Sequence, residues 1–126
     1  MKSFESVYKE IEDLLINSLP NYIEKINKEH NDGLILKSFE NKSLKENCIK
    51  QPCFKFAIEE ADYSEKDRII ENTVFEFSIE IKLQQTENII LWRYIEAINK
   101  MLVEKDNGII ITKVQAAKVL LRITLS

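Results

Sequence analysis

The side chains that could do chemistry are few and scattered along the chain. His30 is the only histidine, so any Ser-His-Asp or Cys-His arrangement would have to use it. It precedes Asn31, Asp32 and Gly33, a sequence typical of a helix end, where we expect an exposed histidine. The residues therefore give no candidate catalytic group, and we expect a protein that is not an enzyme.

Metal and phosphate sites lack their usual residue patterns as well. Cys48 and Cys53 are separated by five positions, which fits neither a C-x-x-C redox pair nor the spacing of zinc ligands. We therefore expect two free thiols, with no bound metal and no disulfide. Gly33 and Gly108 are the only glycines, so no glycine-rich loop can bind a phosphate, and no cofactor is predicted.

Acidic residues are concentrated in one short segment: Glu59, Glu60, Asp62, Glu65 and Asp67. A calcium-binding EF-hand loop needs a glycine in its middle, and this segment has none. A solvated hairpin tip explains the cluster better, with an enzyme that uses these carboxylates as a remaining alternative. The tip also carries Lys66 and Arg68, so it offers both signs of charge for contacts between identical subunits.

The strand that must position this tip is the clearest element in the sequence. Between Thr73 and Leu83, apolar side chains occupy every second position: Phe75, Phe77, Ile79, Ile81 and Leu83. This period of two predicts a β-strand with one face in the core, because a helix cannot sort these residues. The four phenylalanines at 54, 56, 75 and 77 are expected to pack in that core rather than to stack on nucleic-acid bases.

The other elements follow from helical periodicity and turn residues. A helix begins at Ser3, breaks or kinks near Ser18, before Pro20, and continues to about Lys28. Strands are expected at 34–39, 53–58, 109–112 and 118–125, a helix at 89–104, a loop at 41–50 and a charged connection at 59–68. Thr86 to Asn88 offer capping oxygens for the second helix. The order predicts an α+β fold in one domain over 1–126: a mostly antiparallel sheet with both helices on one face.

Charge and composition narrow the classes of partner. The chain has 126 residues and a net charge of -3, which disfavours binding to nucleic acid. Its N-terminal residues do not resemble a signal peptide, and no apolar run approaches the ~20 residues that span a bilayer. We therefore expect a cytoplasmic protein without a membrane partner.

Two surface features are candidate contacts with other proteins. After Asp106 the only charged residues are Lys113, Lys118 and Arg122, so the C-terminal segment is locally basic. A solvated strand face is the ordinary explanation of such a segment. Trp92 lies off the apolar stripe of its helix, where an aromatic residue can serve as an interface anchor.

The architecture as a whole resembles the phage tail terminator family. The matching features are the Leu19-Pro20-Asn21-Tyr22 continuation of the first helix, the strand start at Gln51-Pro52-Cys53-Phe54, the charged tip, the alternating FEFSIEIKL strand, the helix after it and a final strand. The resemblance covers nearly the full length, through patterns rather than a fixed motif. It implies a small α+β protein that forms a ring, typically a hexamer, at the head-proximal end of a tail tube.

That resemblance also implies the partners and the location. The ring would end tube polymerisation and provide the docking surface for a head or collar, next to tube and sheath proteins, in a phage or a phage-like contractile injection particle such as a tailocin. The subunit would be found in the bacterial cytoplasm during virion assembly and then in the particle. Interface residues are expected at the tip, on the second helix and on the C-terminal strand: Glu60, Asp62, Lys66, Arg68, Trp92, Lys118 and Arg122. The alternative is a monomeric α+β protein-binding module of the adaptor or immunity type.

Overall fold

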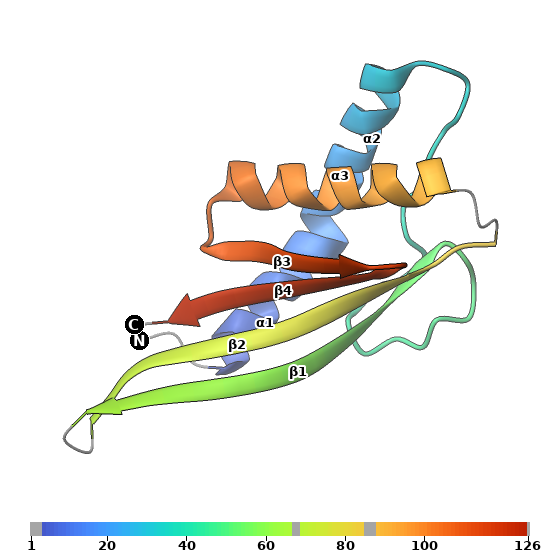
Figure 1. The fold of residues 1–126 in the computed structure, drawn as a ribbon. Helices are drawn as coiled ribbons and strands as arrows, with labels where there is room; N and C mark the ends of the chain where they lie inside the picture. Colours follow the sequence, from blue (N-terminus) through green and yellow to red (C-terminus); the bar gives the residue numbers. More distant parts are fainter. Residues whose placement is uncertain (1–3, 67–68, 85–87, 126) are drawn as a thin grey trace.

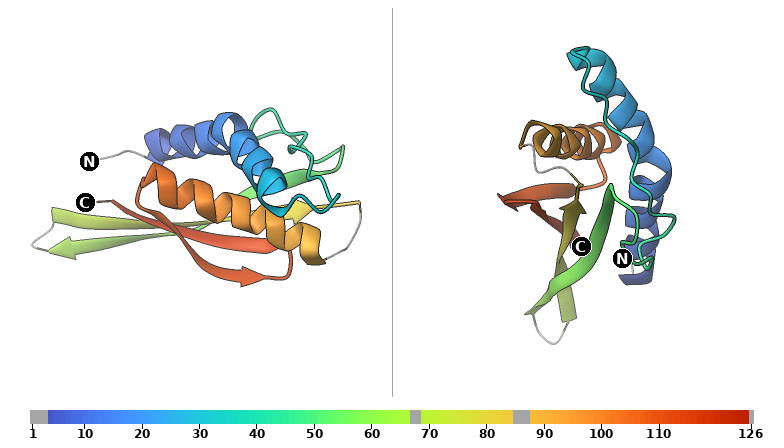
Figure 2. Two further views of the ribbon diagram at one scale, coloured as in Figure 1. Left: turned by 90° about the horizontal axis from the view of Figure 1, so that it is seen from above. Right: turned by 90° about the vertical axis from the view of Figure 1, so that its right-hand side faces the viewer.

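The chain folds into an antiparallel sheet whose helices all lie on one face, an α+β arrangement (Figures 1 and 2). A computed structural model describes residues 4–66, 69–84 and 88–125, with the backbone alone described at 61–66, 69–72 and 125. In chain order the elements are α1 (Phe4–Asp13), η1 (Leu14–Ser18), α2 (Leu19–His30), β1 (Cys53–Lys66), β2 (Ile69–Lys82), α3 (Asn88–Lys105), β3 (Ile109–Gln115) and β4 (Lys118–Leu125). Among the described helices, none combines the length and the apolar character needed to cross a bilayer.

The first helix changes its winding where the sequence predicts a break. Residues Leu14–Ser18 form a π-helical segment between α1 and α2, and Pro20 lies in the first turn of α2, a position that proline tolerates. The helix ends at Asn31, which adopts the left-handed conformation with φ 39° and donates its N–H to the Asn27 carbonyl at 3.1 Å. The expected kink is therefore confirmed as a π-helical turn. Thr86, expected to help cap α3, lies outside the described residues.

The sheet has the strand order β1-β2-β4-β3, so β2 and β4 are its central strands. Along their shared ladder, Phe77 stands opposite Leu121 and Ile79 opposite Val119. All four of these side chains are at most 3% exposed. They meet buried side chains from α1, η1 and α3, among them Ile11, Leu15, Ile98 and Met101. The predicted core face of β2 is thus confirmed, since Phe75 and Ile81 are buried too.

Residues 34–39, expected to form a strand, are irregular and pair with none of the described strands. The Asn27 side-chain amide donates to the Leu36 carbonyl at 2.9 Å and accepts the Leu36 N–H at 2.8 Å. The Tyr94 hydroxyl donates to the Lys37 carbonyl at 2.6 Å. The prediction was wrong because side chains of α2 and α3 satisfy these backbone groups, a role that the sequence pattern assigned to a neighbouring strand.

The expected charged connection at 59–68 is mostly strand. β1 and β2 are 14 residues each and pair from Cys53–Lys82 out to Lys66–Ile69. The acidic residues do not form a loop because Glu59 is accommodated as a bulge, with Ile58 and Glu60 on either side. Between Ile69 and Asn72, before the ladder with β4 begins at Thr73, β2 pairs with β1 alone. The end of this hairpin therefore projects from the four-stranded sheet (Figure 1).

The two cysteines form a disulfide, and the expectation of free thiols was wrong. The loop before β1 brings the Cα atoms of Cys48 and Cys53 to 5.6 Å, within the range that a disulfide spans. Sequence spacing excluded redox and zinc motifs but gave no information on this loop geometry. Cys53 is 1% exposed, so the bond fixes the loop to the first residue of β1.

Replacing Phe77 with alanine should lower the free energy of unfolding by about 3–5 kcal/mol, because a cavity would open in the core. The matched control is Val103→Ala at a side chain that is 70% exposed, with an expected loss below about 0.5 kcal/mol. Denaturant unfolding followed by circular dichroism measures both. A loss below about 1 kcal/mol for Phe77→Ala would mean that the faces of β2 are reversed.

Reduction of the Cys48–Cys53 bond should lower the free energy of unfolding by about 2 kcal/mol, because the bond restricts a short loop of the unfolded chain. Unfolding curves with and without a phosphine reductant test this expectation. The control Cys48→Ser should match the reduced protein and should not respond to the reductant. Two titratable thiols in the unfolded, unreduced protein would contradict the bond.

Candidate functional site

On the sheet face that points away from the helices, polar contacts of Glu59 join three strands. The Ser78 hydroxyl of β2 donates to Oε1 of Glu59 at 2.6 Å, and Nζ of Lys118 in β4 lies 2.9 Å from the same oxygen. Glu59 can reach both partners because it is the extra residue of the β1 bulge. Ser78 is only 2% exposed, so its hydroxyl is satisfied by this acid rather than by bulk solvent.

Glu59 is the residue that these contacts share, and its two partners favour its charged form. The hydrogen bond from Ser78, followed by the bond from Lys118, lowers the pKa of Glu59. Lys118 was predicted to lie at a contact with another subunit or with the tube. In the structure it is paired with an acid of its own chain, so any contact between subunits at Lys118 would have to share that pair or break it.

A second set of charges lies along the same face, one row further toward Cys53. Lys55 of β1 and Lys118 of β4 flank Glu80 of β2 in the ladder, and Nζ of Lys82 lies 2.8 Å from Glu80 Oε1. The hydrogen bond from Lys82, and then the charges of Lys55 and Lys118, lower the pKa of Glu80. The basic C-terminal strand is therefore one part of a mixed-charge face.

The tip residues predicted as contacts lie at different heights on the hairpin. Glu60 is exposed on the outer face, in one cross-strand row with Glu76 and Arg122. Asp62 lies one row further out, opposite Val74, and Lys66 is the last residue of β1. Arg68 lies outside the described residues. The structure thus brings Glu60 and Arg122 onto one surface, with Lys118 four residues along β4 from Arg122, and places Lys66 far along the projecting hairpin.

Trp92 lies where its helical position predicts, on the solvent side of α3. It is 62% exposed, and the same side of the helix carries Ile89 and Val103, which are 50% and 70% exposed. Glu96 and Asn99 lie between them and are also exposed. The outward side of α3 therefore combines three large apolar side chains with few charges.

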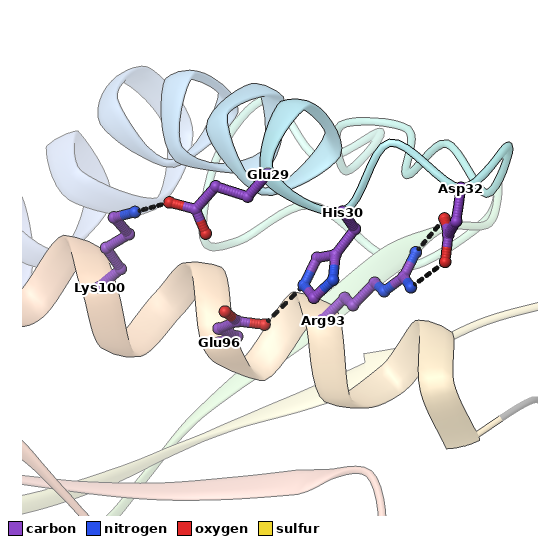
Figure 3. A network of polar contacts seen from close by, with 6 residues as sticks. All are labelled: Glu29, His30, Asp32, Arg93, Glu96 and Lys100. Atoms are coloured by element: carbon purple, nitrogen blue, oxygen red, sulfur yellow. Dashed lines mark hydrogen bonds and ion pairs between the residues drawn. The ribbon is translucent and has the colours of Figure 1, made fainter.

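A polar network that the sequence did not reveal joins the end of α2 to α3 (Figure 3). The Arg93 guanidinium makes two hydrogen bonds to the Asp32 carboxylate, one of them at 2.9 Å. Arg93 is 8% exposed although it carries a charge. The hydrogen bond from Arg93 lowers the pKa of Asp32 well below its usual range, and the same bond raises the pKa of Arg93. The pair fixes the turn after α2 against the helix.

Two further pairs extend this network along α3. Nε2 of His30 lies 3.1 Å from Glu96, and Lys100 donates to Glu29 (Figure 3). The predicted helix-end position of His30 is confirmed, since it is the last residue of α2. Each pair joins residues more than 60 positions apart, which explains why local patterns missed the network. An arginine between Trp92 and Tyr94, on the buried side of a helix, was the available signal.

Within the described parts of the chain, no three His, Cys, Asp or Glu residues come together as a metal site. Three surfaces stand out among the described residues: the mixed-charge outer face of the sheet, the projecting hairpin and the apolar outward side of α3. The class that fold and surfaces define is an α+β protein with several candidate contact surfaces. Comparison with protein-family models, with curated proteins and with solved structures finds no match.

Replacing Asp32 with asparagine should lower the melting temperature at pH 7, because Arg93 would lose its charged partner. The pKa of Asp32 is lowered from its usual value near 3.8, so the stabilisation is fully present above about pH 4 and is lost as the pH falls further. We therefore expect the difference between the two proteins to shrink between pH 4 and pH 2.

The matched control is Asp106→Asn, at a position that follows α3 and makes none of the described ion pairs. Its melting temperature should track the unmodified protein across the whole pH range. A constant difference between Asp32→Asn and the unmodified protein down to pH 2 would contradict a stabilising role for the Asp32 charge.

Proposed function

We propose that this protein is a structural assembly subunit that caps the head-proximal end of a phage or phage-like tail tube as a homo-oligomeric ring. The order of elements resembles tail terminators, and the proposal takes from that resemblance a ring of six. In this role the ring ends tube polymerisation and presents a docking surface to a head or collar. The protein acts through its contacts and catalyses no reaction.

The observation that carries the proposal is the projecting hairpin of β1 and β2. Its outer part, formed by Ile69–Asn72 of β2 and the facing end of β1, is a two-stranded ribbon that no other described strand or helix covers (Figure 1). An isolated two-stranded hairpin is marginally stable in water, so such a ribbon is better accounted for when another molecule covers it. In a ring, the neighbouring subunit or the tube supplies that cover.

The other surfaces fit the same role. A ring requires two different patches on each subunit, because each copy contacts its neighbours with opposite sides. The sheet has two different edge strands, β1 and β3, and the apolar side of α3 with Trp92 is a separate surface. We assign that side of α3 to a partner outside the ring, such as a tube, sheath or collar protein, since aromatic residues are enriched at protein interfaces. Assembly would take place in the bacterial host cytoplasm.

The proposal is tested by mixing the protein with tail tubes assembled from the tube protein of the same genome and imaging the tube ends by electron microscopy. We expect ring-shaped density at one end of each tube. Native mass spectrometry of the released cap should give six copies of the 14.8 kDa chain. Ring formation should weaken as the salt concentration rises, because charged groups border the contact surfaces.

Trp92→Ala provides an internal comparison, since it truncates an exposed side chain away from both sheet edges. It should leave the ring intact and weaken its attachment to the particle. Uncapped ends at saturating protein, together with unchanged tube length after deletion of the gene, would remove the tail-cap role. A monomer that binds one protein partner would then favour the adaptor or immunity alternative.

A further inference from the structure

We infer that copies of this chain join edge to edge, with β3 of one copy adding to β1 of the next to continue the antiparallel sheet. This inference deepens the proposed function, on which it rests, because it names the two surfaces that meet in the ring. The edge of β1 beside Ile58 and the edge of β3 beside Val114 are accessible, since these side chains are 47% and 44% exposed.

The first part of the β1 edge is already closed by a side chain. Asn41 donates its amide to the Phe54 carbonyl at 3.0 Å and accepts the Phe54 N–H at 2.8 Å, as a neighbouring strand would. These bonds show that the backbone groups of Phe54 point away from β2. Phe56 and Ile58 follow at steps of two, so their backbone groups point the same way. Past Asn41, none of the described strands pairs with this edge.

On both edge strands, a bulge increases the spacing between the residues whose backbone N–H and C=O groups point outward. On β1, Glu59 is the extra residue, so the outward groups fall at Ile58 and then at the backbone of Ala61, three residues on. On β3, the register against β4 shifts between Ile111 and Lys113. The same three-residue step therefore separates the outward groups of Ile111 and Val114.

The assignment on β3 follows from the hydrogen bonds of β4. The Ile81 N–H of β2 donates to the Ala117 carbonyl at 2.8 Å, so Ala117 and, at steps of two, Val119 and Leu121 point their backbone groups toward β2. Their partners on β3, Val114 and Ile111, consequently point away from β4. In a regular strand the corresponding step is two residues. Two strands that both step by three fit each other, whereas a strand without a bulge can match only one of the two positions.

The strand directions permit this pairing without turning a subunit over. In Figure 1 the arrows of β1 and β4 run one way and those of β2 and β3 the other, in agreement with the antiparallel order. A second copy in the same orientation therefore offers a β3 that is antiparallel to β1, with its helices on the same side of the sheet. Repetition of one head-to-tail contact is the geometry that a ring requires.

Charge favours pairing of β1 with the neighbour's β3 over pairing of β1 with β1 or of β3 with β3. When Ile58 is placed opposite Val114 of the neighbour, Glu59 and Glu60 on the outer face lie beside the neighbour's Lys113. A two-fold contact of β1 with β1 would instead place Glu59 against Glu60, and like charges directly opposite each other are destabilising. The contact of β3 with β3 would bring two copies of Lys113 together. The apolar pair, Ile58 with Val114, then lies on the helix side of the sheet.

The test uses cysteine pairs in the full chain, with the native Cys48–Cys53 bond retained. Ile58→Cys and Val114→Cys are mixed at high protein concentration and oxidised, and the bonds formed are mapped by mass spectrometry. We expect a bond between positions 58 and 114 in the mixture, at several times the yield of either homodimer. The double variant should give chains of more than two subunits. The matched control pairs Ile58→Cys with Val103→Cys, which is 70% exposed but lies on α3.

A charge exchange tests the register. Lys113→Glu in the Val114→Cys chain should lower the yield of the 58–114 bond severalfold, and Glu60→Lys in the Ile58→Cys chain should restore it. Equal yields of 58–114 and 58–103, or a dominant 58–58 bond, would overturn the inference. This test can succeed or fail independently of the test of the tail-cap role. A 58–114 bond with uncapped tubes keeps this interface and removes the proposed function, whereas capped tubes without that bond do the reverse.

Discussion

The burial of one face of β2 is the constraint on which the rest of the structure depends. Phe75, Phe77, Ile79 and Ile81 remove their side chains from water only because α1, η1 and α3 cover the same side of the sheet. Each residue of β2 is paired on both sides, with β1 and with β4, over most of its length. A one-residue slip would exchange these apolar side chains for the polar set between them, so the packing and the hydrogen-bond register fix each other.

The fold followed from the sequence wherever burial produces a regular pattern. The alternation in β2 and the three- and four-residue steps of the helices gave the fold class, the kink near Pro20 and the exposure of Trp92. The patterns failed at 34–39, where an irregular apolar segment is satisfied by Asn27 and Tyr94 rather than by a strand. They failed again at 59–66, because a bulge lets a highly charged segment continue as a strand. Neither arrangement leaves a periodic signal.

The surfaces were less predictable than the core. Sequence reasoning identified the acidic segment and the basic terminal strand, but their pairing through Glu59, Ser78 and Lys118 depends on the strand order, which no local pattern specifies. The same holds for the contact of Asp32 with Arg93, which needs α2 and α3 to lie side by side (Figure 3). Long-range polar contacts follow from topology, so they become visible only after the elements have been placed.

The Asn41 side chain determines how much of the β1 edge is available. Its amide bonds to both backbone groups of Phe54, and Asn41 as a whole is 9% exposed. It begins the loop that the Cys48–Cys53 disulfide joins to β1. Any strand that approaches from outside must therefore stop before Phe54. The Asn41 side chain thus limits the register of any added strand. An edge that could pair in many alignments has a defined first position, directly after Phe54. Alignment errors are a route to aggregation for exposed strands, and this limit reduces the number of alignments that can occur.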